Sequence, residues 1–92
     1  MAESALGRVN DGISLLEKDD LSHAEMAFRD AIRLDPDCAE AHLRLGWVLL
    51  SREKNLDAGA VFKSALRIDP DSAAAHEGLG LVLFNERRTR TR

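Results

Sequence analysis

The sequence has little of what several protein classes depend on. Its 92 residues include one cysteine, Cys38, which allows no internal disulfide and favours a reducing, cytoplasmic location. No apolar run approaches the roughly 20 residues that cross a bilayer. The polar start at residues 1–4 is not followed by the apolar segment of a secretory leader. These features argue against membrane insertion and against secretion.

Residue patterns that carry catalysis are also missing. The chain has no glycine-rich phosphate loop, no catalytic triad and no set of residues at metal-ligand spacing. His42 and His76 stand one repeat apart, and we expect them to pack between structural units instead of binding a metal. Nothing in the sequence near Cys38 indicates an activated thiol. We therefore expect no enzyme activity, no cofactor and no metal.

Charge of neither sign dominates the chain. The net charge is −3 with 32% charged residues, which argues against nucleic acid as the main partner. Four arginines, Arg87, Arg88, Arg90 and Arg92, gather at the end of the chain. We expect them to suit the negative end of the last helix and then to fray into solvent.

What the sequence does contain is a unit that recurs every 34 residues. Its first half reads Ala5-x6-Gly12, Ala39-x6-Gly46 and Ala73-x6-Gly80, and its second half reads Ala24-x3-Phe28-x2-Ala31-x3-Asp35-Pro36-Asp37 and Ala58-x3-Phe62-x2-Ala65-x3-Asp69-Pro70-Asp71. Self-similarity at a fixed period of this length is typical of stacked helical repeats.

Apolar residues follow a helical spacing throughout the chain. The pattern predicts helices over residues 4–18, 22–34, 38–52, 56–68 and 72–87. Asp35-Pro36-Asp37 should end one helix and start the next, because proline has no N–H and restricts the residue before it. We expect Asp37 to cap the third helix together with Glu40. The turns within each unit are short, which forces antiparallel helix pairs.

These motifs resemble the tetratricopeptide repeat family. That family has a small residue at position 8 of its unit, Ala at 20, an aromatic residue at 24, Ala at 27 and Pro at 32. The matching residues here are Gly12, Ala24, Phe28, Ala31 and Pro36, then Gly46, Ala58, Phe62, Ala65 and Pro70, and finally Gly80. The resemblance implies a single all-α, right-handed helical-repeat stack of five antiparallel helices, A1-B1-A2-B2-A3. Its parts would be repeats at about 5–38 and 39–72, a last helix at about 73–88 and a basic tail at 89–92.

The small residues of this pattern have an expected role in packing. Gly12, Gly46 and Gly80 should let paired helices approach closely, and Phe28 or Phe62 should fill the gap towards the next unit. Gly59 departs from the pattern, since glycine inside a helix costs up to about 1 kcal/mol relative to alanine.

The resemblance also implies a function, because the first helix of each unit lines a concave groove in this family. By position, the expected groove residues that bind a partner are Val9, Ile13, Leu16, Leu43, Arg44, Trp47, Leu50, Glu77, Leu81 and Phe84. Most of them are apolar, and an exposed apolar stripe often marks an interaction surface. The groove is therefore expected to hold an apolar peptide or helix of another protein, with Trp47 near its centre.

Some members of the family clamp the terminal carboxylate of heat-shock chaperones with Lys and Asn side chains. The matching positions here hold Val9, Ile13, Arg44, Ala74 and Gly78. Only Arg44 could serve, so the resemblance does not extend to a chaperone-tail clamp.

The last expected helix leaves a second interpretation open. Leu79, Leu81, Val82, Leu83 and Phe84 make it apolar almost all round, and such a helix needs cover on two sides. Either two or more copies of the chain cover each other, in a homodimer or a larger assembly, or the chain is a fragment of a longer repeat protein.

Overall fold

The computed structural model describes residues 4–90, which form five α-helices and, within that range, no strand. In chain order these are α1 (Ala5–Glu17), α2 (Leu21–Leu34), α3 (Ala39–Ser51), α4 (Asn55–Ile68) and α5 (Ala73–Arg90). The expectation of an all-α stack of five helices is confirmed. The first four helices lie within one residue of their predicted ends. The fifth continues to Arg90, so the last arginines of the described range are helical; Arg92 lies outside it.

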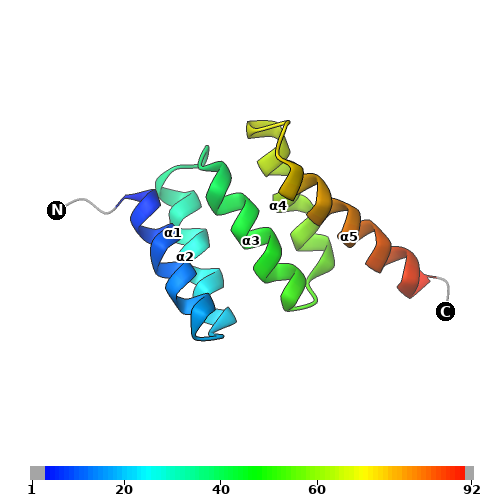
Figure 1. Ribbon diagram of the computed structural model, residues 1–92, viewed down its shortest axis with the longest axis horizontal. Coiled ribbons are helices and arrows are strands. Elements are labelled where there is room, and N and C mark those ends of the chain that lie inside the picture. Colours follow the sequence, from blue (N-terminus) through cyan, green and yellow to red (C-terminus); the bar gives the residue numbers. More distant parts are fainter. Residues whose placement is uncertain (1–3, 91–92) are drawn as a thin grey trace.

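The helices form two layers. Helices α1, α3 and α5 lie in the nearer layer of Figure 1, with α2 and α4 behind them, and α5 is at one end of the stack. Each helix packs against the next one in the chain, and α3 also contacts both α1 and α5. Among the described residues, no helix is both long enough and apolar enough to cross a membrane.

The turns between α1 and α2 and between α3 and α4 share one backbone feature. Asp19 and Glu53, one repeat apart, both have positive φ angles, of 61° and 63°. A left-handed residue just past a helix closes its end and reverses the chain sharply. The equivalent residue in the third unit is Arg87, which lies inside α5. The chain therefore does not reverse there, and α5 runs on past the point at which α1 and α3 end.

The turn before α3 is built differently from our expectation. The Asp35 Oδ1 atom accepts a hydrogen bond from the Asp37 N–H at 3.1 Å, which closes a turn around the proline. The N-cap of α3 is Cys38, and its side chain makes no capping bond. Glu40 instead accepts a hydrogen bond from Arg44. The prediction that Asp37 and Glu40 form a capping box is therefore wrong, because the local Asp35 turn places the cap one residue later.

The two repeat-position histidines fasten these turns to the helices that follow them. His42 Nε2 lies 2.8 Å from the carbonyl oxygen of Pro36, and His76 Nε2 lies 2.9 Å from that of Pro70. The ring nitrogen must donate in both pairs, since a carbonyl oxygen only accepts. Both prolines are exposed to solvent. The prolines end a helix and provide the carbonyl oxygen that accepts the histidine hydrogen bond; they do not pack between helices.

Each phenylalanine of the core lies against a glycine of its own helix pair. A Cβ atom built on Gly12 would lie 2.5 Å from the Phe28 ring, and one on Gly46 would lie 2.6 Å from the Phe62 ring. Gly78 of α5 approaches the Phe62 ring more closely still. Both rings are fully buried. Phe62 thus joins α3, α4 and α5, and Phe28 joins α1 to α2 in the same way.

The expectation for Gly80 is wrong. A Cβ atom on Gly80 would meet no other atom within 4 Å, and the residue is exposed. Gly78 makes the contact with the preceding phenylalanine instead, because it faces the core while Gly80 lies on the opposite side of α5. The four alanines of the repeat pattern are all buried at helix contacts: Ala24, Ala31, Ala58 and Ala65.

A buried carboxylate links the two helix pairs. Glu25 of α2 accepts hydrogen bonds from Arg29 at 3.0 Å and from Arg52, beyond α3, at 2.6 Å, and Lys54 lies 3.4 Å away. Its side chain is only 10% exposed. Burial raises the pKa of Glu25, but the hydrogen bonds from the two arginines and the charge of Lys54 outweigh it, so the pKa is lowered.

The second junction lacks this link. The position equivalent to Glu25 is Gly59, and a Cβ atom there would lie 3.3 Å from Val82 Cγ1 of α5. Glycine inside α4 thus lets α5 come close, which accounts for a residue that otherwise weakens a helix. Asn85 adds a hydrogen bond to Asn55 at 3.3 Å.

We predict opposite effects for the same substitution at two equivalent glycines. Gly46→Ala should lower the free energy of unfolding by roughly 1–3 kcal/mol, because the buried Phe62 ring has no room to move away. Gly80→Ala should raise it by up to about 1 kcal/mol, because alanine favours the helix and meets no neighbour. Urea unfolding followed by circular dichroism, at low protein concentration, measures both. Equal shifts of the same sign would contradict this packing.

We predict that Glu25 makes stability dependent on pH in the acidic range. Because its pKa is lowered in the folded state, its contribution is present at neutral pH. That contribution is lost as the pH falls below the ordinary range of a glutamate and through the lowered pKa. Glu25→Gln should cost about 1–2 kcal/mol at neutral pH and less at about pH 3. Urea unfolding of both proteins at the two pH values tests this. A difference that does not shrink in acid would contradict it.

Candidate protein-binding face

Helices α1, α3 and α5 carry the residues that the repeat pattern assigns to partner binding. We call the surface formed by these residues the inner face. Its centre is on α3, where Leu43, Trp47 and Leu50 are half-buried: each packs against the core and keeps part of its side chain accessible. Such side chains expose apolar surface while the core holds them in place, so they are suited to contact another protein.

Trp47 is held from the second layer of helices. Its ring lies edge-on to the Phe62 ring of α4, with centroids 5.4 Å apart and an interplanar angle of 77°. This is a favourable geometry for two aromatic rings. The same phenylalanine that fixes the helices therefore also fixes the orientation of Trp47, and a partner would meet an indole that is already ordered.

Helix α1 contributes less to the inner face than the sequence predicted. Ile13 and Leu16 are half-buried, as on α3, but Val9 is only 1% exposed and belongs to the core. The expectation that Val9 binds a partner is wrong, because its side chain is buried in the core cluster and offers no accessible surface. Leu6, one turn earlier, is largely exposed.

Among the residues assigned to the inner face, the two most exposed apolar side chains lie on α5. Leu81 is 44% exposed and Phe84 is 56% exposed, whereas Trp47 and Leu50, their equivalents one repeat earlier, are half-buried. Arg88 lies over the Phe84 ring, 6.0 Å from its centroid. Glu77 is exposed on the same helix. The α5 residues are more accessible because no helix follows α5 within the described range.

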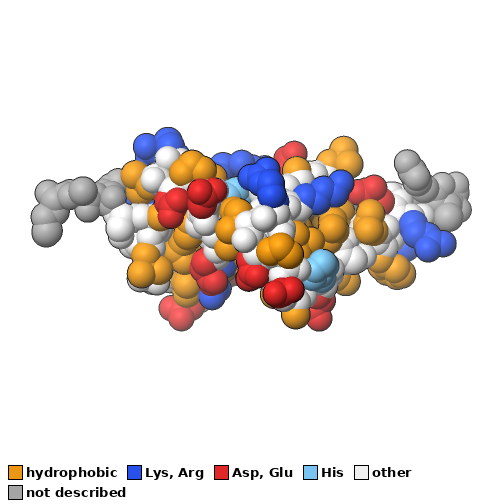
Figure 2. All heavy atoms as spheres, turned by 90° about the horizontal axis from the view of Figure 1, so that it is seen from above, with side chains coloured by type: hydrophobic (Ala, Val, Ile, Leu, Met, Phe, Trp, Pro, Cys, Tyr) orange, Lys and Arg blue, Asp and Glu red, His pale blue; other side chains and the backbone are white. Residues whose placement is uncertain are grey.

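The basic residue of the inner face is paired with an acidic one on the same helix. Arg44, the one candidate for a carboxylate clamp, donates from Nε to Glu40 four residues earlier on α3. A partner carboxylate would have to compete with Glu40 for this arginine. Figure 2 shows acidic and basic side chains interspersed with apolar ones over the molecule, and no area of a single sign stands out in that view.

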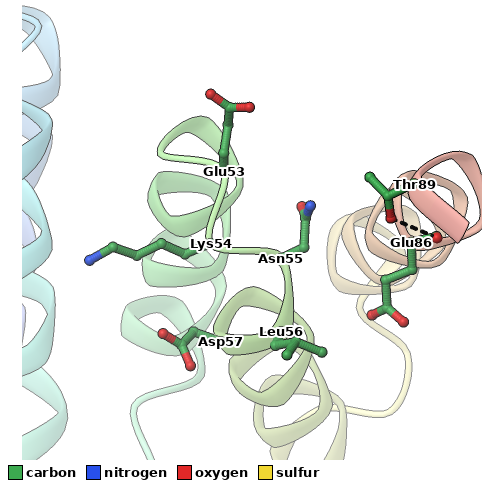
Figure 3. A pocket seen from close by; sticks show the side chains of 7 residues that line it. All are labelled: Glu53, Lys54, Asn55, Leu56, Asp57, Glu86 and Thr89. Atoms are coloured by element: carbon green, nitrogen blue, oxygen red, sulfur yellow. Dashed lines mark hydrogen bonds between the residues drawn. The ribbon is translucent and has the colours of Figure 1, made fainter. Parts of the chain in front are cut away.

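Two hollows lie away from the inner face, and the sequence analysis found neither. One of about 650 Å³ separates the start of α4 from the end of α5. Figure 3 shows Leu56 and Glu86 on its two sides, with the Thr89 hydroxyl donating to the Glu86 carbonyl oxygen. It exists because α5 continues where α1 and α3 end. The other, of about 450 Å³, lies between α1 and α2 and includes Arg8, Asp11 and Met26.

Titratable side chains of the kinds that ligate a metal are present within the described residues. Within residues 4–90, no three His, Cys, Asp or Glu side chains are placed to hold a metal ion. Cys38 is a free, half-buried thiol in the turn before α3. Glu25 is hydrogen-bonded to Arg29 and Arg52, with Lys54 nearby.

Comparisons with known proteins agree with this arrangement. The chain is similar to the TPR domain of Arabidopsis OM64, with 24% identity and a TM-score of 0.86 over 89% of this chain and 68% of that one. It is also similar to a crystal structure of MamA, with 25% identity and a TM-score of 0.87 over 90% of this chain and 48% of that one. A third similar structure is the second TPR domain of human RPAP3 in complex with the HSP70 peptide SGPTIEEVD, with 25% identity and a TM-score of 0.81 over 86% and 66%.

The chain thus spans about two thirds of the OM64 and RPAP3 domains and about half of MamA. A search of curated protein sequences found no match. The sequence model described as tetratricopeptide repeat matches residues 10–73, well over half of the chain. Together with the helix pairs and the glycine–phenylalanine contacts, this match shows that the chain belongs to the tetratricopeptide repeat family, whose fold supports protein–protein interaction.

Proposed function

We propose that the protein is an interaction module that binds an apolar peptide or helix of another protein on its inner face. The main support for this proposal is that side chains on α3 are both partly exposed and held in place. Leu43, Trp47 and Leu50 are partly accessible, and Trp47 is held in place by Phe62. Apolar surface that remains exposed yet ordered is a common mark of a binding site.

The chemistry of the face favours an apolar ligand over an acidic one. The similar RPAP3 domain was solved with a peptide that ends in EEVD. In this chain the positions that would clamp such an end hold Ile13, Ala74 and Gly78, the core residue Val9, and Arg44, which is paired with Glu40. None of these groups offers an uncommitted cation. Leu43 and Leu81 instead extend the apolar surface around Trp47.

A cytoplasmic location and a function without catalysis complete the proposal. Cys38 has no second cysteine with which to form an internal disulfide, which suits a reducing compartment. The family to which the chain belongs consists of interaction scaffolds, and the inner face offers apolar contacts in place of a reacting group.

We predict that Trp47→Ala and Leu81→Ala weaken peptide binding by at least about tenfold each, because binding energy concentrates in buried aromatic and apolar anchors. Suitable probes are peptides selected from a random displayed library against the wild-type protein. Their affinities are measured by isothermal titration. Met26→Ala is the matched control, since Met26 is exposed on α2 in the other layer of helices.

Circular dichroism separates lost binding from lost folding, which matters because Trp47 contacts Phe62. Leu81 is the second test for the same reason: its side chain is 44% exposed and its removal leaves the core intact. Peptides that bind both variants as tightly as the wild type, or a selection that yields only acidic peptides, would sink the proposal.

We propose self-association as a second function of the same chain. The observation that favours it is on α5, where Leu83 is 53% exposed, whereas its equivalent Leu49 is fully buried. A helix with this much exposed apolar surface gains free energy when a second helix covers it.

We predict that the mass in solution rises from 10.2 kDa towards twice that value as the protein concentration increases. Light scattering over a dilution series up to about 1 mM covers the range of weak dimers. A mass that stays at that of one chain throughout would rule out self-association and leave the inner face as the only candidate.

A further inference from the structure

We propose that two copies of the chain pair through α5 in antiparallel orientation, with Phe84 of each copy seated on Gly80 of the other. This proposal rests on the self-association proposed above and specifies its surface and register. The partner proposed for this face is a second copy of the chain, because α5 carries both parts of the contact: the glycine and the exposed ring.

The first half is an empty glycine notch. Gly12 and Gly46 each accept the ring of a phenylalanine from the next helix. Gly80 holds the same position in the third unit; apart from its chain neighbours and the nearby backbone of α5, no atom of the described residues lies within 4 Å of the place where its Cβ would be. Gly78 and Val82 face the core, so Gly80 faces away from it. In the first two units the glycine at this position contacts a phenylalanine ring, but among the described residues no ring lies against Gly80.

The second half is an exposed ring on the same helix. Phe84 stands four residues after Gly80, so both lie on one side of α5 about one turn apart. Its side chain is 56% exposed. When two antiparallel helices place Phe84 opposite Gly80, the twofold axis places the second Phe84 opposite the second Gly80. The face is therefore complementary to itself, and each copy supplies one ring and one notch.

The charges of α5 agree with this register. Glu77 lies three residues before Gly80, and Arg87 lies three residues after Phe84. When Phe84 of one copy lies opposite Gly80 of the other, Glu77 of one copy also lies opposite Arg87 of the other. Arg88 is beside this Arg87, and the same arrangement occurs at both ends of the contact. His76 comes near the same arginines, and its Nε2 is bonded to Pro70. A parallel pairing would place like charges together instead, which costs free energy.

The place of α5 in the fold leaves room for this approach. Figure 1 shows α5 as the last helix of its layer, at one end of the stack. Leu83, on the same side of the helix, is 53% exposed and would meet the second Leu83 near the twofold axis.

Cysteine cross-linking tests the orientation. Glu77→Cys and Arg87→Cys variants, each also carrying Cys38→Ser, are mixed and oxidised. The expected product joins residue 77 of one chain to residue 87 of the other, in excess over 77–77 and 87–87 products. Homotypic products in excess would overturn the antiparallel pairing. Cross-links no more frequent than in denaturant would do the same.

Substitutions at the ring and the notch test the contact itself. Phe84→Ala and Gly80→Ala should each raise the dissociation constant of the dimer by at least about tenfold, measured by sedimentation equilibrium. Gly80→Ala should do so although it stabilises the single chain, so a folding defect cannot explain the loss. Leu56→Ala, at an exposed residue of α4, is the control and should leave the constant unchanged.

Charge exchange separates this arrangement from self-association in general. Glu77→Arg should weaken the dimer, and adding Arg87→Glu and Arg88→Glu in the same chain should restore it. If the wild type dimerises but none of these substitutions matters, the register is wrong while self-association stands. If the wild type remains a single chain at every concentration, both proposals fall.

Discussion

The contact between the Phe62 ring and two glycines is the interaction on which the rest of the structure depends. A fully buried ring can reach the backbones of both α3 and α5 only where no Cβ intervenes, and Gly46 and Gly78 provide those two places. Close packing of this kind leaves few alternative arrangements, since neither the ring nor the backbone can shift alone. The positions of three helices are thereby set by one side chain.

The same ring connects the core to the proposed binding face. Because Phe62 meets Trp47 edge-on, the orientation of the indole on the inner face follows from the packing of the core. Any change that loosens the α3–α4–α5 contact would also release Trp47. A binding surface that is ordered before the partner arrives loses less conformational entropy on binding, which is a reason for the most prominent side chain of the face to stand directly over the central contact.

Much of the fold could be predicted from the sequence because its signals are local and repeated. The 34-residue period, the proline turns and the helical spacing placed four helices within one residue of their ends. The failures involve residues whose role depends on neighbours in space. Val9 was assigned to the inner face, but it is buried in the core, and repeat position alone does not report how closely two helices approach. Gly80 fits the repeat, but Gly78 makes the contact with the phenylalanine ring, and the earlier units have no glycine at the position equivalent to Gly78.

The site was less predictable than the fold for the same reason. Helical spacing places Trp47, Leu50 and Leu81 on one side of their helices but does not say how much of each remains accessible. The hollow beside Glu86 follows from the missing reversal at Arg87, which only the backbone shows. The Glu25 cluster joins residues far apart in the chain, so no local sequence pattern predicts it.

The two junctions of the stack are held by different forces. Glu25 and its cations join α2 to the end of α3, whereas Gly59 and Val82 join α4 to α5 through apolar contact. Salt screens a buried, hydrogen-bonded carboxylate only weakly, while cooling weakens hydrophobic contact. The two junctions therefore respond differently to temperature: low temperature acts first on the α4–α5 junction, and the α2–α3 junction keeps its ionic link.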